Sequence, residues 1–355
     1  MSEKFLITGG SGFIGSNLAN SLLSDGFSVT VLDSLARSGA QNNLAWLRTK
    51  HGNGRLEFVH GDIRDFATVQ SAVKEVDVIY HFAGQVAVTS SVDDPRLDFE
   101  VNSLGTLNVL EAARLSERKP IVIEASTNKV YGRMESVETV ELESRYMYRD
   151  LPHGISESQP LDFHSPYGCS KGSADQYVRD YSRIYGLRTV VFRMSCIYGP
   201  RQFGNEDQGW LVHLILAAEN GTPITIYGDG KQVRDVLFID DLIKAYRLAV
   251  EKIDATAGQV YNIGGGPSNT ISIWKEFGPL LSQISGREIP VVFENWRPGD
   301  QLCYISDIRK AKLHMGWQPQ VTSEVGLRQL REWVCSNKQM LAPLKPKSGA
   351  GEVGV

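Results

Sequence analysis

The chain has 355 residues, of which 42% are hydrophobic and 22% are charged, as in a soluble globular protein with one large core or two smaller ones. These proportions exclude a disordered, collagen-like or disulfide-scaffold chain. The 37 Lys and Arg residues against 41 Asp and Glu residues give a formal charge of −4, which predicts no general attraction to nucleic acid or to an anionic membrane. An anionic ligand must therefore be bound by a few well-placed cations.

The cysteines and the N-terminus predict the compartment. Four cysteines are widely spaced without a CxxC pair, which predicts free thiols and no cysteine-based zinc site: Cys169, Cys196, Cys303 and Cys335. The chain reaches Gly9 too early for a signal peptide, and no apolar run is long enough to cross a bilayer. We expect a cytoplasmic protein with no membrane segment and no metal.

Short apolar runs alternate with helical stretches over residues 1–193. Strands are predicted at residues 4–8, 28–32, 56–59, 76–82, 121–125 and 189–193, and helices at 16–23, 97–115 and 167–185. This alternation predicts an α/β fold, a Rossmann-like doubly wound parallel sheet with helices on both faces. Residues 133–165 are polar with little periodicity, and we interpret them as an insertion or lid.

The pattern changes after residue 193 to shorter elements separated by Gly and Pro. Strands are predicted at 223–227 and 260–263, and helices at 239–251, 270–285 and 323–336. We expect a smaller mixed α/β C-terminal lobe over residues 194–340 that binds substrate, with some elements interleaved with the first domain. Residues 343–355 have little to bury and are predicted to be a disordered tail.

A glycine-rich turn lies between the first predicted strand and its helix. Gly9, Gly12 and Gly15 form a GxxGxxG pattern, in which glycines allow a tight turn and close approach of a pyrophosphate to the helix N-terminus. Asp33 ends the second strand, where a carboxylate can bind the adenosine ribose and repel a 2′-phosphate. This favours NAD over NADP, although a nearby arginine leaves the choice open. The neighbouring residues assigned to the same site are Phe13, Ile14, Ser34 and Arg37.

Two further segments follow predicted strands at the same edge of the sheet. Asp62 and Ile63 are candidates for flanking an adenine ring, with the carboxylate binding the amino group. Phe82, Ala83 and Gly84 offer small residues where the backbone passes close to a cofactor. An ordinary turn explains either segment as well.

Tyr167 and Lys171 open a predicted helix after Ser165-Pro166. Their spacing of four residues places the phenol and the ammonium on one helix face. A cation beside a phenol stabilises phenolate, so the tyrosine can accept a proton from an alcohol. The alternative is an ordinary exposed pair, but the preceding dinucleotide half-fold favours catalysis.

Two hydroxyl groups follow the fifth predicted strand, at the edge where ligands bind in this architecture. Ser126 and Thr127 are both candidates for holding the substrate alcohol opposite the tyrosine. Spacing alone does not choose between them.

Several motifs occur together in one order. TGGSGFIG at 8–15, HFAGQ at 81–85, STNKVYG at 126–132, SPYGCSK at 165–171 and RDVLFIDD at 234–241 resemble the extended short-chain dehydrogenase/reductase family, in its sugar-nucleotide branch. The similarity covers nearly all of residues 4–338. The resemblance implies bound NAD, a catalytic triad of Thr127, Tyr167 and Lys171, contact of Lys171 with the nicotinamide ribose, and a sugar nucleotide bound by the C-terminal lobe.

The residues after Thr127 bear on the reaction. Dehydratases of this family carry an Asp-Glu pair there for water elimination, whereas this chain has Asn128 and Lys129, which cannot act as those carboxylates do. Segments 126–132, 162–177, 201–210 and 230–235 are similar to members that invert C2 of a CDP-linked 3,6-dideoxyhexose in lipopolysaccharide O-antigen synthesis. We therefore expect an NAD-dependent 2-epimerase. The alternatives are a UDP-hexose 4-epimerase, a 4,6-dehydratase-like enzyme and a non-catalytic NAD-binding protein.

The resemblance also implies a substrate site and an assembly. The residues expected to line the CDP-sugar site are Gln85, Val88, Thr127, Asn128, Lys129, Arg201, Gln208, Tyr227, Arg234 and Arg297. Arg234 and Arg297 are expected to bind the diphosphate, because a guanidinium fork suits phosphate oxygens. Relatives pair through two helices each, so residues 97–115 and 167–185 predict a homodimer or homotetramer.

Overall fold

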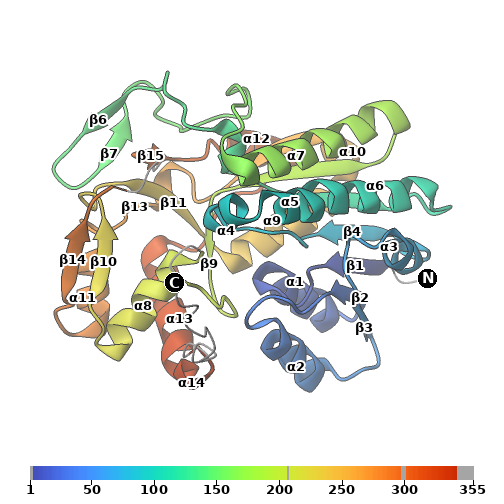
Figure 1. The fold of residues 1–355 in the computed structure, drawn as a ribbon, viewed down its shortest axis with the longest axis horizontal. Coiled ribbons are helices and arrows are strands. Elements are labelled where there is room, and N and C mark those ends of the chain that lie inside the picture. Colours follow the sequence, from blue (N-terminus) through green and yellow to red (C-terminus); the bar gives the residue numbers. More distant parts are fainter. Residues whose placement is uncertain (1–2, 206–207, 297–300, 342–355) are drawn as a thin grey trace, which may run out of the picture.

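A parallel sheet of seven strands forms the larger half of the computed structural model, which describes residues 3–205, 208–296 and 301–341 (Figure 1). The strand order is β12-β8-β5-β4-β1-β2-β3. Its strands are β1 (Lys4–Thr8), β2 (Ser28–Asp33), β3 (Leu56–His60), β4 (Val78–His81), β5 (Ile121–Thr127), β8 (Thr189–Met194) and β12 (Gln259–Ile263). The chain order reverses between β1 and β4, and a crevice at the carboxyl ends beside such a reversal is where ligands bind. The predicted fold class is confirmed.

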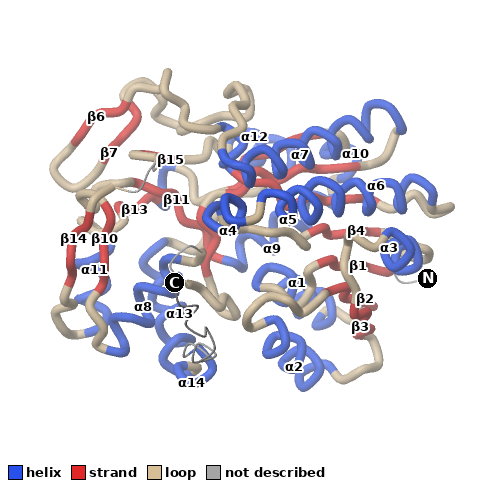
Figure 2. The backbone as a smooth tube through the Cα atoms, viewed as in Figure 1, coloured by secondary structure: helices blue, strands red, loops and turns tan. Residues whose placement is uncertain are grey.

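Helices cover both faces of this sheet because its strands bury side chains on both sides (Figure 2). One face packs against α1 (Phe13–Ser24) and α9 (Ile239–Glu251), with α2 (Ala40–His51) beside α1. The other face packs against α3 (Phe66–Val73), α6 (Gly105–Leu115) and α7 (Ser165–Tyr185). Phe5 and Ile7 belong to the first core and Leu6 to the second, as alternation along a strand requires.

The helix predicted over residues 97–115 is divided into three parts. α5 (Pro95–Phe99) is capped by Asp94, a π-helical turn follows at Glu100–Leu104, and α6 continues from Gly105. The π turn directs Ser103 toward α7, where its hydroxyl donates to the Ser170 carbonyl at 3.1 Å. The short helix α4 (Val88–Asp93) precedes α5.

Short strands and four helices make up the smaller half. β9 (Cys196–Tyr198), β11 (Val233–Phe238), β13 (Thr270–Ser272) and β15 (Cys303–Tyr304) form one sheet, and β10 (Ile224–Tyr227) pairs with β14 (Val291–Glu294). The helices are α8 (Trp210–Asn220), α11 (Phe277–Ser285), α13 (Ser323–Ser336) and α14 (Lys338–Leu341). The remaining helical segments are η2 (Asn128–Tyr131), α10 (Ile253–Thr256), η3 (Pro267–Asn269) and α12 (Arg309–Met315).

The prediction of one helix over residues 270–285 is wrong at its start. Thr270–Ser272 forms β13, which pairs antiparallel with β11, and the helix begins only at Phe277. The backbone N–H groups of Trp274 and Lys275 donate to the Gly230 carbonyl, so a turn separates strand from helix. Pairing with β11 therefore overrides the local helical pattern.

The segment 133–165 packs on the smaller half. It contains an antiparallel hairpin of β6 (Thr139–Glu141) and β7 (Tyr146–Tyr148). Tyr148 and Ile155 share a buried cluster with Val233 and Tyr304, and the Ile155 N–H donates to the Ile305 carbonyl at 2.7 Å.

Several sequence-based expectations concern what the chain lacks. All four cysteines are free thiols. In the described ranges no helix has the length and apolarity needed to cross a membrane. The expected disordered tail lies outside the described residues.

Asp241 joins the two halves through a buried carboxylate. It stands in the first turn of α9, is fully buried, and accepts the backbone N–H groups of Gln320 and Val321 at 2.8 Å each. Its own carbonyl accepts the indole N–H of Trp317 at 2.9 Å. The chain between α12 and α13 is thereby fixed on α9.

Asp241→Ala removes a fully buried carboxylate that accepts two backbone N–H groups, so we expect the free energy of unfolding to fall by about 2–4 kcal/mol. Urea denaturation followed by circular dichroism measures this. Asp240→Ala is the matched control, because Asp240 is exposed in the same helix turn. Equal effects of the two substitutions would contradict this account of Asp241.

Candidate active site

The glycine turn lies at the carboxyl end of β1 and leaves no room for side chains. Gly9 has φ +67°, and a Cβ there would lie 2.7 Å from the Ala83 nitrogen. A Cβ on Gly15 would lie 2.4 Å from the Gly9 carbonyl oxygen. Gly12 is the N-cap of α1, and Phe13 and Ile14 form its first turn. The turn therefore presents bare backbone at a helix N-terminus, which suits a pyrophosphate.

Asp33 is fixed beside this turn by two backbone hydrogen bonds. Its carboxylate accepts the Ser11 N–H at 2.9 Å and the Leu35 N–H at 2.8 Å. Burial raises the pKa of Asp33, and the two hydrogen bonds oppose that rise. Ser34 and Arg37 are exposed on the loop that follows. The carboxylate thus stands at the rim of the turn, as expected for a ribose ligand.

The other predicted cofactor residues divide into two groups. Ala83 lies beside the glycine turn, since its N–H donates to the Thr8 hydroxyl and a Cβ on Gly9 would meet its backbone, whereas a Cβ on Gly84 would meet Asn102. Phe82 is turned inward, against the Tyr246 ring at 4.8 Å between centroids.

Asp62 and Ile63 have other contacts in the structure. The Asp62 carboxylate pairs with Arg64 at 2.8 Å, and this hydrogen bond lowers its pKa. Ile63 is buried in the core against Gly105. Contact of Asp62 and Ile63 with an adenine stays a prediction.

The structure brings Thr127, Tyr167 and Lys171 together. Thr127 ends β5, Tyr167 stands in the first turn of α7, and Lys171 follows one turn later. All three are buried, and the pKa of Tyr167 is raised by burial, against the opposing charge of Lys171 and a hydrogen bond with Thr127. The arrangement pairs a phenol with a hydroxyl on one side and a cation on the other, as a proton acceptor for an alcohol requires.

Ser126 and Thr127 point in different directions. The Ser126 hydroxyl donates to Asp175 at 3.0 Å, and Asp175 binds Arg193 through two bonds of 2.8 Å. Thr127 faces Tyr167. The geometry therefore favours Thr127 as the hydroxyl on the substrate side, while Ser126 belongs to the base of the site.

Sequence reasoning missed two buried titratable residues beneath the triad. Glu124, in the middle of β5, accepts a hydrogen bond from the Lys171 ammonium at 2.6 Å. Its other oxygen lies 3.6 Å from Nε2 of His81, at the end of β4. A carboxylate directly after the apolar run Ile121–Val122–Ile123 was the available signal, because a buried charge needs a partner.

On the expected substrate side, the loop after β4 is internally bonded. The Gln85 N–H donates to Asn102 at 2.9 Å and its side-chain amide donates to the Ala87 carbonyl at 2.7 Å. Val88, the first residue of α4, is 39% exposed, which leaves apolar surface for a ligand.

A second group gathers around Gln301. Lys129 donates to the Gln301 side chain at 3.5 Å, and Arg234 donates to the Gln301 carbonyl at 2.8 Å. Asn128, beside Lys129, accepts a hydrogen bond from the Thr127 hydroxyl at 3.3 Å. The two cations therefore stand on the substrate-lobe side of Thr127, and Arg297 lies outside the described residues.

The remaining predicted substrate residues are placed separately. Gln208 bonds to both Arg37 and the Val86 carbonyl, which links the substrate lobe to the loop after β2. The Arg201 guanidinium stacks on Trp46 of α2, 4.1 Å from the ring centre. Tyr227 ends β10 in the smaller half.

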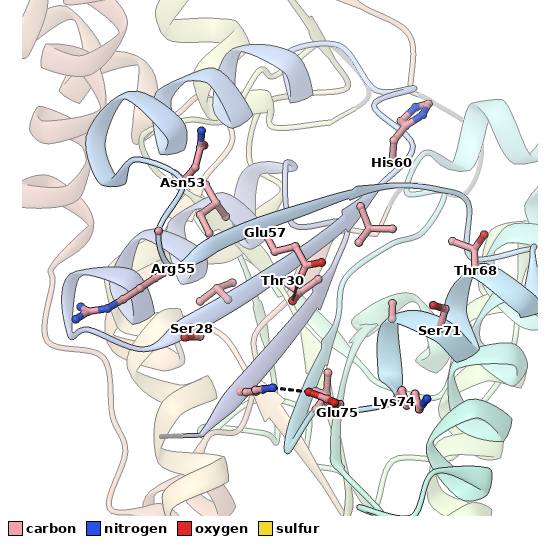
Figure 3. A pocket seen from close by; sticks show the side chains of 17 residues that line it. Ser28, Thr30, Asn53, Arg55, Glu57, His60, Thr68, Ser71, Lys74 and Glu75 are labelled. Atoms are coloured by element: carbon pink, nitrogen blue, oxygen red, sulfur yellow. Dashed lines mark hydrogen bonds and ion pairs between the residues drawn. The ribbon is translucent and has the colours of Figure 1, made fainter. Parts of the chain in front are cut away.

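A surface groove between β3 and α3 is a separate feature (Figure 3). Arg55, Glu57 and Ser71 are among the residues that line it, and two further lining residues, Lys4 and Glu75, form an ion pair of 2.6 Å. No member of the triad lines it. Across the described part of the chain, no group of three or more His, Cys, Asp or Glu side chains is arranged to hold a metal.

Comparisons with known proteins identify the family of the chain. The sequence profile of the family described as GDP-mannose 4,6 dehydratase matches residues 6–330. A CDP-paratose 2-epimerase of Salmonella typhi is 46% identical over 94% of this chain and 99% of its own length. A dTDP-glucose 4,6-dehydratase of Streptomyces venezuelae, DesIV, solved with NAD and TYD bound, superposes with a TM-score of 0.82 at 32% identity, over 96% of this chain and 100% of that one. A UDP-glucose 4-epimerase of Thermotoga maritima with UDP-glucose gives a TM-score of 0.81 at 29% identity, over 94% of this chain and 99% of that one.

The chain belongs to the GDP-mannose 4,6 dehydratase family of short-chain dehydrogenase/reductases, which contains NAD-dependent sugar-nucleotide epimerases and dehydratases. The predicted family membership is confirmed, and NAD as the cofactor is confirmed at the level of the family. The glycine turn and Asp33 fit that cofactor, because the tightly packed turn presents bare backbone at the N-terminus of α1, which suits a pyrophosphate, and the Asp33 carboxylate stands beside it.

Asp33→Ser removes the carboxylate from the rim of the turn. We expect NAD to bind about tenfold more weakly or worse, since hydrogen bonds to a charged group contribute about 1.5–3 kcal/mol. NADP should lose no affinity, because the repulsion of its 2′-phosphate disappears. Isothermal titration of the cofactor-free protein measures both constants.

Asp65→Ser is the control, because Asp65 is an exposed cap of α3. A parallel loss of NAD and NADP binding in Asp33→Ser would indicate damage to the turn and would contradict the assigned role.

Proposed function

We propose that this protein is an NAD-dependent epimerase that inverts C2 of a CDP-linked 3,6-dideoxyhexose, converting CDP-paratose to CDP-tyvelose. The observation that carries the proposal is the 46% identity to a CDP-paratose 2-epimerase along nearly the whole of both chains. The buried triad of Thr127, Tyr167 and Lys171 supplies the chemistry this reaction needs.

Each residue of the triad has a separate role in the removal and return of hydrogen at C2. Tyr167, as phenolate, accepts the proton of the C2 hydroxyl, and the Lys171 ammonium stabilises that phenolate. Thr127 holds the same substrate oxygen from the other side. The glycine turn and Asp33 would hold NAD⁺, which would supply the acceptor for the hydride from C2 and the donor that returns it to the opposite face. Tyr167 then gives the proton back to the new alcohol.

Dehydration is disfavoured by the residues beside Thr127. Elimination of water needs an acid and a base next to the sugar, and this chain places an amide, Asn128, and an ammonium, Lys129, there. A UDP-hexose 4-epimerase is the second candidate, since a putative UDP-glucose 4-epimerase of Methanocaldococcus jannaschii is 32% identical over 94% of this chain.

Substrate contacts are proposed for two clusters. Lys129 and Arg234, which meet at Gln301, supply positive charge for the diphosphate, with Arg297 as a third cation. The residues proposed around the sugar and the base are Gln85, Val88, Asn128, Arg201, Gln208 and Tyr227. These contacts would orient C2 toward Tyr167.

Assembly and location form the last part of the proposal. Large apolar side chains are exposed along the paired helices α5 and α7, including Phe99 at 57% and Ile184 at 65%. Residues 97–115 and 167–185 would pair two copies through this surface, giving a homodimer or homotetramer. The enzyme would act in the cytoplasm and supply a sugar for the lipopolysaccharide O-antigen.

Incubation of the purified protein with CDP-paratose, without added reductant, tests the activity. Proton NMR should show CDP-tyvelose forming to an equilibrium mixture, because C2 inversion consumes no external hydride. Tyr167→Phe should lower the rate by 100-fold or more, the scale of general acid–base catalysis, and should keep the fold.

Parallel incubation with UDP-glucose separates the second candidate. Formation of UDP-galactose without any C2 inversion of CDP-paratose would overturn the proposal in favour of a 4-epimerase. Absence of turnover in both assays, with NAD bound, would favour a non-catalytic role.

A further inference from the structure

β5 presents one apolar and two polar side chains in a row to α7. Alternate residues of a strand share one face, and Val122, Glu124 and Ser126 all lie on the face that packs against α7. Glu124 is fully buried, at 0% exposure. A carboxylate at this depth is unstable unless a cation or several donors face it.

The cation that faces Glu124 is the catalytic lysine. Nζ of Lys171 donates to Oε1 of Glu124 at 2.6 Å. Asp175, a second carboxylate of this region, is matched separately, because it binds Arg193 through two bonds of 2.8 Å. Glu124 therefore depends on Lys171, and Lys171 is held at its free end by Glu124.

His81 lies beside Glu124 but does not supply a positive charge to its carboxylate. Its ring is bonded on both sides, to Thr8 at 2.7 Å and to Thr106 at 3.0 Å. Burial lowers the pKa of His81 more than the nearby Glu124 raises it, so the ring is neutral near pH 7. Oε2 of Glu124, 3.6 Å from Nε2 of His81, is buried without a hydrogen bond. Because the His81 ring is neutral, Lys171 is the cation that balances the Glu124 carboxylate.

We propose that Glu124 is a positioning residue of the reaction: from the centre of β5 it holds the Lys171 ammonium beneath Tyr167 and keeps it charged. This inference rests on the proposed function for the reaction it serves, but the contact itself belongs to the chain. Two effects follow from a carboxylate at this place. It keeps the proton on Lys171 to higher pH, and it offsets part of the pull that the ammonium exerts on the Tyr167 phenol.

The electrostatic surroundings of the pair agree with this role. Burial lowers the pKa of Lys171, and the charge of Glu124, followed by Tyr167, more than compensates, so the net shift is upward. The titratable and charged groups that face Lys171 or Tyr167 from the packed elements include Glu124 of β5, His81 of β4, Asp98 of α5, Asp175 of α7 and Arg37 of the loop after β2.

Glu124→Gln tests the proposal, because the amide keeps the shape and an acceptor for Lys171 but removes the charge. The pH profile of kcat for C2 inversion should move to lower pH in both limbs, by about one pH unit. On the acidic side, the pKa of Tyr167 should fall, because Glu124 no longer offsets the positive charge of Lys171. On the alkaline side, Lys171 loses its proton earlier. KM should change less than about twofold.

A readout without turnover uses the cofactor-free protein. In NMR titrations of protein with isotope-labelled lysine side chains, the Lys171 signal, assigned with Lys171→Arg, should titrate about one pH unit lower in Glu124→Gln. Glu219→Gln is the matched control, since Glu219 is a buried partner of Arg331 and Lys338 outside the site. It should move neither the Lys171 titration nor the pH limbs.

The outcomes separate the two proposals. If the wild-type protein does not invert CDP-paratose, the proposed function fails, while the lysine titration still tests Glu124. Unchanged limbs and an unchanged Lys171 titration in Glu124→Gln would overturn the inference. If that variant does not fold, Glu124→Asp replaces it, and its longer gap to the ammonium must lower the Lys171 titration; no lowering would equally overturn the inference.

Discussion

The Lys171 ammonium is a charge buried between α7 and the central sheet, and the structure around the site is arranged to satisfy it. Glu124 supplies the opposing carboxylate at 2.6 Å, from a strand whose neighbours are apolar. One turn further along α7, Asp175 and Arg193 repeat the pattern of a matched buried pair. Because the Lys171–Glu124 and Arg193–Asp175 pairs form only in one position of α7 on the sheet, they fix the register of this helix. Tyr167 therefore lies at the carboxyl end of β5, beside Thr127.

The two halves of the molecule meet beside Lys171 and Tyr167. The glycine turn brings bare backbone within reach of Ala83, so the end of β1 and the end of β4 meet at the reversal of strand order. From the other half, Gln301 gathers Lys129 and Arg234 on the substrate side of Thr127. Asp241 holds the segment after α12 onto α9, which ties the smaller half to the sheet that carries the triad.

Periodicity and motif order were sufficient to predict the sheet, because strands buried on both faces read as apolar runs. The helix over residues 239–251 and the one over 323–336 coincide with α9 and α13 for the same reason. Residues 270–285 were mispredicted, since the pairing of β13 with β11 is a long-range contact that local spacing does not contain. The choice between Ser126 and Thr127 likewise needed Asp175, distant in sequence, to show where Ser126 points. The sequence alone shows that Glu124 is a charged residue after an apolar run. Its pairing with Lys171 could not be predicted, because it depends on how α7 packs against β5.

In the proposed reaction, C2 is inverted by removing a hydrogen with its electrons and returning that same hydrogen to the other face, while Tyr167 moves only the hydroxyl proton. CDP-paratose carrying deuterium at C2 tests this most directly when it is converted in ordinary water and the product is analysed by NMR and mass spectrometry. Return of the same hydride should give CDP-tyvelose that keeps the deuterium at C2. Product with solvent hydrogen at C2 would contradict it, because the hydrogen would then have left as a proton.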